Sequence, residues 1–181
     1  MKALDRIETK QDYEVIKRDA LERFKDKRYS YECLAILIGL DTGLRASDLL
    51  RLRVKDISYN EDCNRYECLS NIQKTNVTNH VTIISRDTHK VFKALSHNSE
   101  YIFTNIKTND LYTRFWLSKR TNLRYGFNFH TLRKISAKRI LEVGTLSDAQ
   151  RHLAHKRASS TDAYLKVSEK SSLDRISVLY N

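Results

Sequence analysis

Hydrophobic and polar residues follow a helical period in the first quarter of this 181-residue chain. Residues 11–27 mix charged side chains with apolar ones at helical spacing, which predicts an amphipathic helix. Residues 30–40 contain an eight-residue apolar run from Cys33 to Leu40 and predict a buried helix. Residues 46–53 predict a short helix that opens at Ala46-Ser47-Asp48. Residues 41–45 lie between the last two elements and form a tight turn in this interpretation.

The pattern then changes to one typical of strands. Residues 65–72 (RYECLSNI) and 80–84 (HVTII) are rich in residues that favour β-structure. The segment between them, Gln73 to Asn79, contains threonines and asparagines that suit a turn. The sequence therefore predicts a β-hairpin with Lys74 at its bend.

The second half of the chain predicts helices again. An apolar face over 131–143 predicts a helix that stops at Gly144, a residue typical of helix C-terminal ends. The other expected elements are a short extended piece at 101–103 and helices over 87–96, 110–123, 147–154, 158–166 and 170–180. The expected fold class is α+β, mostly α-helical with a small antiparallel β-sheet.

The composition gives no sign of a division into domains. The chain has no proline, four glycines and no low-complexity stretch that would mark a linker. Its length falls within the roughly 100 to 200 residues usual for one domain. We therefore expect residues 1–181 to form a single domain.

Membrane insertion and export are not expected. The longest apolar run is far shorter than the roughly 20 residues that span a bilayer. The N-terminus, MKALDRIETK, has no apolar stretch of signal-peptide length. Three cysteines can neither pair completely nor complete a four-ligand structural zinc site. These features favour a reducing cytosol and no membrane partner.

The charge distribution favours a polyanionic partner. The formal net charge is +11, with a sequence pI near 9.6. Residues 105–170 hold 14 basic and 5 acidic side chains, against 18 and 16 in residues 1–104. A nucleic-acid surface is therefore expected in the C-terminal half. A basic face that is merely solvated is an equally common interpretation of such an excess.

Several side chains suit phosphate chemistry. Arg45 lies in the predicted turn with Asp48 three residues later, although such a pair alone is more often a structural salt bridge. His130 and Arg133 share one face at the start of a predicted helix, where free N–H groups favour phosphate. Tyr164 would ordinarily be core or surface filler. Each signal is weak alone, and their order along the chain is more informative.

The ordered segments are TGLRASDLLRL (42–52), IQKT (72–75), HTLRKISAKRILEVG (130–144) and HLAHKRASSTDAYLKV (152–167). This series resembles the catalytic domain of the tyrosine recombinases, also called the phage integrase family. The resemblance runs from about residue 10 to about residue 175. Its specificity comes from the combination of an arginine turn, a hairpin lysine, an H-x-L-R motif and a histidine nine residues before a tyrosine.

The resemblance implies a role for each residue. Tyr164 would attack the scissile phosphate, form a 3′-phosphotyrosyl bond and release a 5′-hydroxyl. Arg45 and Arg133 would stabilise the charge that develops on the phosphate. Lys74 would protonate the leaving 5′-oxygen, and His130 would assist proton transfer at the tyrosine. The remaining implied roles are a hydrogen bond from His155 to the phosphate and orientation of Arg45 by Asp48.

Two departures from the family pattern concern the motifs themselves. Lys134 follows Arg133 where relatives often have a histidine. His152-Leu153-Ala154-His155 stands where relatives have L-L-G-H, so two histidines compete for one role. The nine-residue spacing to Tyr164 favours His155. The other histidines have no motif around them and are expected at the surface: His80, His89 and His97.

The resemblance implies a site-specific DNA recombinase that needs no cofactor and no metal. The implied partner is double-stranded DNA, bound as a homotetramer on paired sites by a protein that is monomeric in solution, with possible accessory DNA-bending proteins. Residues 168–181 are expected to form a tail exchanged between protomers. The size resembles short DNA-inverting recombinases of the fimbrial phase-variation type, or an excised integrase catalytic domain, in either case without an N-terminal core-binding domain. The alternatives are a non-catalytic DNA-binding regulator and type IB topoisomerase-like relaxation.

Overall fold

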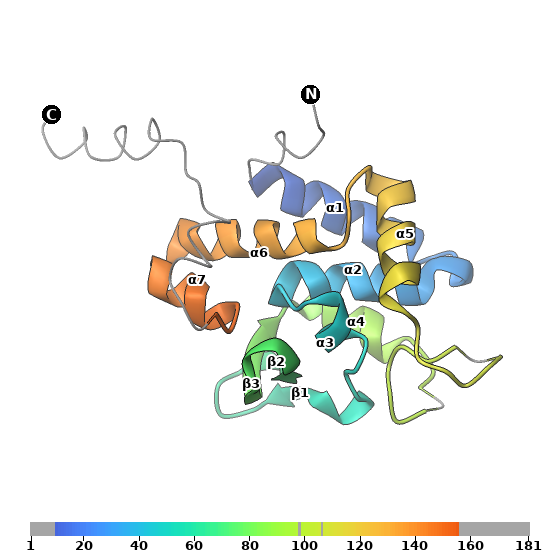
Figure 1. Ribbon diagram of the computed structural model, residues 1–181, viewed down its shortest axis with the longest axis horizontal. Helices are drawn as coiled ribbons and strands as arrows, with labels where there is room; N and C mark the ends of the chain where they lie inside the picture. The colour runs from blue at the N-terminus through green and yellow to red at the C-terminus, as the bar shows by residue number, and fades with distance from the viewer. Residues whose placement is uncertain (1–9, 98, 106, 156–181) are drawn as a thin grey trace, which may run out of the picture.

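The computed structural model describes residues 10–97, 99–105 and 107–155 (Figure 1). The α-helices are α1 (Lys10–Arg23), α2 (Ser30–Thr42), α3 (Ala46–Leu49), α4 (Arg86–Lys93), α5 (Arg114–Tyr125), α6 (His130–Val143) and α7 (Leu146–His152). Short 3₁₀ turns are η2 (Lys27–Tyr29), η3 (Val54–Asp56) and η4 (Gln73–Thr75). The strands β1 (Ile57–Asn60), β2 (Arg65–Ile72) and β3 (Val77–Ile84) form one antiparallel sheet in the order β1-β2-β3. The predicted α+β class, mostly helical with a small antiparallel sheet, is confirmed.

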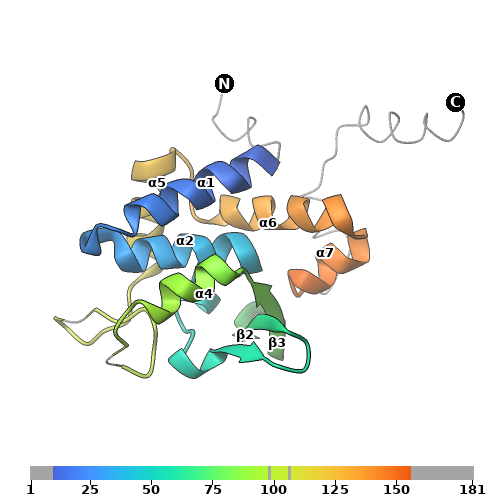
Figure 2. The same ribbon diagram turned by 180° about the vertical axis from the view of Figure 1, so that it is seen from behind.

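Helix α2 is the centre of the core. Every residue from Ser30 to Thr42 except Tyr31 is buried. Figures 1 and 2 show α1 and α6 on one side of α2, and α4 and the sheet on the other. A helix that is apolar on all sides is stable only when other elements surround it. The apolar run from Cys33 to Leu40 therefore fixes the arrangement of the whole domain.

The end of α2 directs the chain toward the first candidate residue. Gly43 has φ +62°, in the left-handed region that favours glycine, and its N–H donates to the carbonyl oxygen of Gly39 at 3.0 Å. A Cβ added to Gly43 would lie 2.7 Å from a methyl carbon of Leu153. The chain therefore reverses here against the end of α7, and Arg45 follows as the N-cap of α3.

The predicted hairpin is present, with a shorter turn than expected. Strand β3 begins at Val77, which pairs with Ile72, so the bend spans four residues rather than Gln73 to Asn79. Asn76 closes the bend with φ +51°, a conformation that asparagine tolerates. Lys74 lies in η4, at the bend, as predicted. Strand β1 was not predicted, and it pairs with β2 from Ile57 to Asn60.

Helix α6 ends where predicted but for a different reason. Gly144 has φ −140° and ψ −167°, an extended backbone rather than a left-handed cap. The next helix starts at once with a capping box, in which Thr145 N–H donates to Asp148 Oδ2 at 2.8 Å and Asp148 N–H donates to Thr145 Oγ1 at 3.2 Å. The start of α7 therefore ends α6. The helices predicted over 158–166 and 170–180 lie outside the described residues.

The surface placement predicted for three histidines was wrong, because all three are half-buried. His89 stacks on Tyr66 with ring centroids 4.2 Å apart, and His97 stacks on Phe92 at 4.5 Å. His80 contacts the C-terminal end of α7. Within the described residues, no helix is both long and apolar enough to cross a bilayer.

Candidate active site

Among the candidate residues that the structure describes, Arg133 is the most deeply buried, with 2% of its surface exposed. It lies in the first turn of α6. Its Nη1 donates to the carbonyl oxygen of Gly43 at 2.5 Å, and its Nη2 donates to the carbonyl oxygen of Leu153 at 2.6 Å and to His155 Nε2 at 2.7 Å. These three acceptors are uncharged, and they fix the orientation of the guanidinium. The positive charge is thereby held between the Gly43 turn and the end of α7.

Arg45 provides a second guanidinium from the neighbouring turn. It has extended backbone angles at the N-cap of α3 and is half-buried. Its Nη1 is buried and has no hydrogen-bond partner within the described residues. A buried donor without a partner carries a desolvation cost that an anionic ligand would relieve. Arg45 is therefore suited to receive a phosphate oxygen.

Asp48 does not hold Arg45 in the way the sequence suggested. In the part of the chain that the structure describes, no ion pair joins the two side chains. Asp48 Oδ1 instead accepts the backbone N–H of Gln73 at 3.3 Å, which ties α3 to the turn that carries Lys74. Burial raises the pKa of Asp48, although the Gln73 N–H and the charge of Arg45 act in the opposite direction. In this structure Asp48 therefore connects α3 to the hairpin turn.

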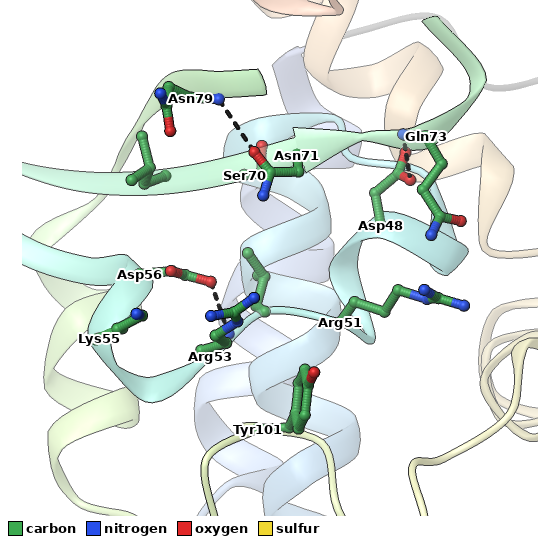
Figure 3. Close-up of a pocket in the computed structure, with 12 residues that line it drawn as sticks. Asp48, Arg51, Arg53, Lys55, Asp56, Ser70, Asn71, Gln73, Asn79 and Tyr101 are labelled. Carbon is green, nitrogen blue, oxygen red and sulfur yellow. Dashed lines mark hydrogen bonds between the residues drawn. The ribbon is translucent and has the colours of Figure 1, made fainter. Parts of the chain in front are cut away.

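The carboxylate of Asp48 also lines a pocket of about 390 Å³ next to this turn. Figure 3 shows the hydrogen bond between Asp48 and Gln73 at one end of the pocket and Arg53 and Asp56 at the other. The pocket is lined from α3, η3 and β2, and none of the arginines, histidines or lysines proposed for catalysis lines it. Apart from Asp48, the pocket shares no lining residue with the candidate site.

Lys74 and His130 extend the site toward solvent. Both residues are exposed, Lys74 in η4 and His130 at the first position of α6. The pKa of His130 is lowered by partial desolvation of its ring and by the charges of Arg133 and Lys134, with smaller effects from Arg45 and Lys74. His130 is therefore neutral near pH 7. Lys134 adds positive charge beside His130.

The ring of His155 is hydrogen-bonded to Arg133, whereas the ring of His152 is hydrogen-bonded to Ser136. Desolvation, Arg133 and Arg45 together lower the pKa of His155 to about 4, with smaller contributions from His130 and Lys74. A neutral imidazole that accepts a hydrogen bond at Nε2 carries its proton on Nδ1. The ring of His152 instead lies 2.8 Å from Ser136 Oγ. His155, which the spacing argument prefers, is therefore the histidine in contact with Arg133, and its role stays a prediction.

The charges of Arg45, Lys74 and Arg133 act on the pKa values of both His130 and His155. The described structure therefore brings these five predicted side chains close together. Tyr164 lies outside the described residues. The acceptors that hold Arg133, the carbonyl oxygens of Gly43 and Leu153, were not foreseen, because backbone carbonyls leave no signal in a sequence. Within the described residues, no group of three or more histidine, cysteine or acidic side chains could hold a metal ion.

Comparison with known proteins assigns this arrangement to a family. The sequence profile described as the phage integrase family matches residues 9–171. No curated protein sequence matches the chain significantly. The fold is similar to three solved structures. XerA recombinase is 14% identical with a TM-score of 0.70, covering 93% of this chain and 62% of that one.

The other two structures were solved with DNA. XerH site-specific recombinase bound to difH substrate, a pre-cleavage complex, is 16% identical with a TM-score of 0.71, covering 96% of this chain and 54% of that one. A lambda integrase dimer bound to a COC′ core site is 21% identical with a TM-score of 0.60, covering 86% of this chain and 46% of that one. This chain therefore spans between about half and two thirds of their lengths. With a family match over most of its length and the shared fold, this chain belongs to the phage integrase family.

Proposed function

We propose that this chain is the catalytic domain of a site-specific recombinase that cleaves and rejoins DNA strands through a 3′-phosphotyrosyl bond on Tyr164. The observation that carries the proposal is the buried guanidinium of Arg133, held by neutral acceptors from the Gly43 turn and from α7. A buried positive charge that is held in a fixed orientation is suited to stabilise the negative charge of a phosphate in the transition state. Membership of the phage integrase family supports the same chemistry.

The scissile phosphate would lie at the N-terminal end of α6. Arg133 and Arg45 would stabilise the negative charge that develops on its non-bridging oxygens. The positive end of the dipole of this 14-residue helix favours the same anion. The Nδ1 proton of His155 would donate a further hydrogen bond. These groups together provide the charge stabilisation that a divalent cation supplies in other phosphoryl-transfer enzymes.

The displacement needs one proton to leave the nucleophile and one to reach the leaving group. The phenolic oxygen of Tyr164 forms a bond to phosphorus while the bond from phosphorus to the 5′-oxygen breaks. His130, neutral near pH 7, is suited to accept the phenolic proton. The ammonium of Lys74 is suited to protonate the departing 5′-oxygen. Attack by a 5′-hydroxyl on the phosphotyrosyl bond reverses these steps and rejoins the strand.

We further propose that four copies assemble on two DNA sites and that residues 168–181 pass to a neighbouring copy. A groove of about 850 Å³ between β3 and the α6–α7 pair supports this assignment. Val77, Val81, Ile140 and Val143 contribute apolar surface to it, and β3 is an edge strand. Leu173, Ile176 and Tyr180 are spaced to present one apolar stripe to such a groove. Accessory DNA-bending proteins remain part of this proposal.

Covalent capture tests the proposed activity. Fragmented genomic DNA of the organism that encodes the protein is incubated with the protein in EDTA, and protein–DNA adducts are isolated under denaturing conditions. We expect adducts from the wild type, and a decrease of at least about a hundredfold for Arg133→Ala, which removes transition-state stabilisation. Arg18→Ala, on the exposed face of α1, is the matched control and retains capture.

Three outcomes would contradict parts of the proposal. DNA binding without any adduct would indicate a regulator that keeps the fold without the chemistry. Capture that EDTA abolishes and Mg²⁺ restores would contradict the arginine-based, metal-independent mechanism. Relaxation of supercoiled plasmid without preference for any site would indicate topoisomerase-like activity instead of recombination.

A further inference from the structure

The C-terminal end of α7 sets the position of Arg133. Two of the three acceptors described above, the carbonyl oxygen of Leu153 and Nε2 of His155, lie within three residues of one another at this end. A movement of α7 relative to α6 would therefore release the guanidinium from two acceptors at once. The position of the Arg133 guanidinium therefore depends on where this seven-residue helix lies.

Few large apolar side chains hold α7, although Ala149 is buried and Ala154 belongs to the main core. Ala137 and Leu153 form a small buried cluster separate from the main core, with Leu141 packed against it. A cluster of this size limits how firmly apolar burial alone can fix a short helix. Polar contacts must supply much of the remaining restraint.

Those polar contacts converge on His152. Its ring Nε2 lies 2.8 Å from Oγ of Ser136 in α6, a residue that is 1% exposed. Its carbonyl oxygen accepts a hydrogen bond from Nε2 of His80 in β3 at 3.0 Å. One residue thus connects α7 to both of the elements that flank it. It also immediately precedes Leu153.

The hydrogen bonds around His152 are consistent with a neutral ring. Ser136 Oγ donates to the carbonyl oxygen of Asp41 at 3.4 Å, so its lone pairs can accept a hydrogen bond from the Nε2–H of His152. Burial lowers the pKa of His152 to about 4, and His80, Arg133 and Arg139 act in the same direction while Asp41 opposes them. Near pH 7 the ring therefore donates one hydrogen bond without adding charge beside Arg133.

We propose that His152 is a positioning residue that fastens α7 between α6 and β3 and thereby keeps Leu153 and His155 in contact with Arg133. The catalytic consequence rests on the proposed function, whereas the geometric consequence does not. His152 departs from the apolar residue of the family pattern, and Ser136 is the side chain that gives its ring a buried partner.

The geometric consequence is measured in the DNA-free protein by titrating the ring of His155 with NMR. In the wild type we expect His155 to titrate near pH 4. In His152→Leu, which keeps an apolar side chain but loses the donor, we expect its pKa to rise toward 6.5, because the ring returns to water and moves away from Arg133. In His152→Gln, whose amide can still donate to Ser136, the low value is expected to persist.

Two further variants complete the design. Ser136→Ala removes the acceptor and is expected to reproduce the effect of His152→Leu. If the leucine variant fails to fold, Ser136→Ala is compared with the wild type in its place. His97→Leu removes a half-buried histidine hydrogen-bonded to the carbonyl oxygen of Phe92 and serves as the matched control. An unchanged titration of His155 in folded His152→Leu or Ser136→Ala, or an equal rise in His152→Gln, would overturn the proposal.

The catalytic consequence is measured separately by covalent capture. We expect His152→Leu to lower the rate of adduct formation by about tenfold or more, with DNA affinity nearly unchanged, and His152→Gln to restore it. If the His155 titration shifts in His152→Leu but the wild type forms no adduct, the proposed function is wrong and the positioning role still holds. Normal capture by His152→Leu would contradict the catalytic consequence alone.

Discussion

At the scale of single residues, the site depends on which groups carry charge. Desolvation lowers the pKa of His130 and His155, and the positive charges of Arg133, Arg45 and Lys74 lower it further, so both histidines are neutral near pH 7. Neutral histidines can accept or donate a proton without competing with the cations for the phosphate. The cations therefore supply fixed positive charge, and the neutral histidines are suited to proton transfer.

Lys74 allows this division to be tested. If it only protonates the leaving 5′-oxygen, a substrate with sulfur at the 5′-bridging position should restore cleavage to Lys74→Ala, because a thiolate leaves without a proton. We expect a loss of about a hundredfold or more on ordinary DNA and close to wild-type rates on the sulfur substrate. The measurement compares single-turnover cleavage of both substrates by both proteins. An equal defect on the two substrates would make Lys74 a phosphate-binding side chain.

At the scale of elements, strong local patterns were predicted well. The uninterrupted apolar run of α2 and the β2–β3 hairpin are encoded within a few residues of sequence. Strand β1 was missed because only its first residue, Ile57, is buried, which leaves no alternation to detect. The pairing of Asp48 with Gln73 joins residues 25 apart in sequence, and no local pattern reports such a contact.

The turn after α2 leads to a prediction about the stability of two glycine variants. Gly43→Ala should destabilise the protein more than Gly126→Ala, although both glycines have positive φ. A left-handed backbone costs a non-glycine residue about 1–2 kcal/mol at either position. Only at Gly43 does the added Cβ also meet Leu153 at 2.7 Å, whereas nothing lies within 4 Å of a Cβ at Gly126.

Urea denaturation of the two variants measures the difference. We expect Gly43→Ala to lose more free energy of unfolding by about 1 kcal/mol or more, the usual scale for overpacking. It should also impair capture, because the displaced Leu153 carries an acceptor of Arg133. Equal stability of the two variants would show that the Gly43 turn has room that the structure does not indicate.

At the scale of the whole molecule, the proposed function requires several copies to assemble on DNA. The basic excess of residues 105–170 favours electrostatic contact of a single copy with DNA phosphates, so we expect binding to weaken steeply with salt. The apolar groove beside β3 is the surface that the proposed tail exchange would cover. Binding by one copy and assembly of several copies are therefore separable properties.

Deletion of residues 170–181 separates them. We expect the shortened protein to bind a single half-site with nearly unchanged affinity but to lose cooperative binding to a paired site and recombination. Gel-shift titrations with captured DNA sites measure the affinity for a single half-site and the cooperativity of binding to a paired site. Val143→Lys, which places a charge in the groove at an exposed position, should reproduce the loss of cooperativity. Full recombination by the truncated protein would refute tail exchange.

The proposed cleavage chemistry depends above all on the identity of the nucleophile. Captured protein–DNA adducts are digested with nuclease and protease, and the peptide that carries the residual nucleotide is identified by mass spectrometry. The account predicts a phosphotyrosyl bond on Tyr164, and no adduct from Tyr164→Phe, which retains DNA binding. Modification of Tyr180 or any other tyrosine, or continued adduct formation by Tyr164→Phe, would contradict it.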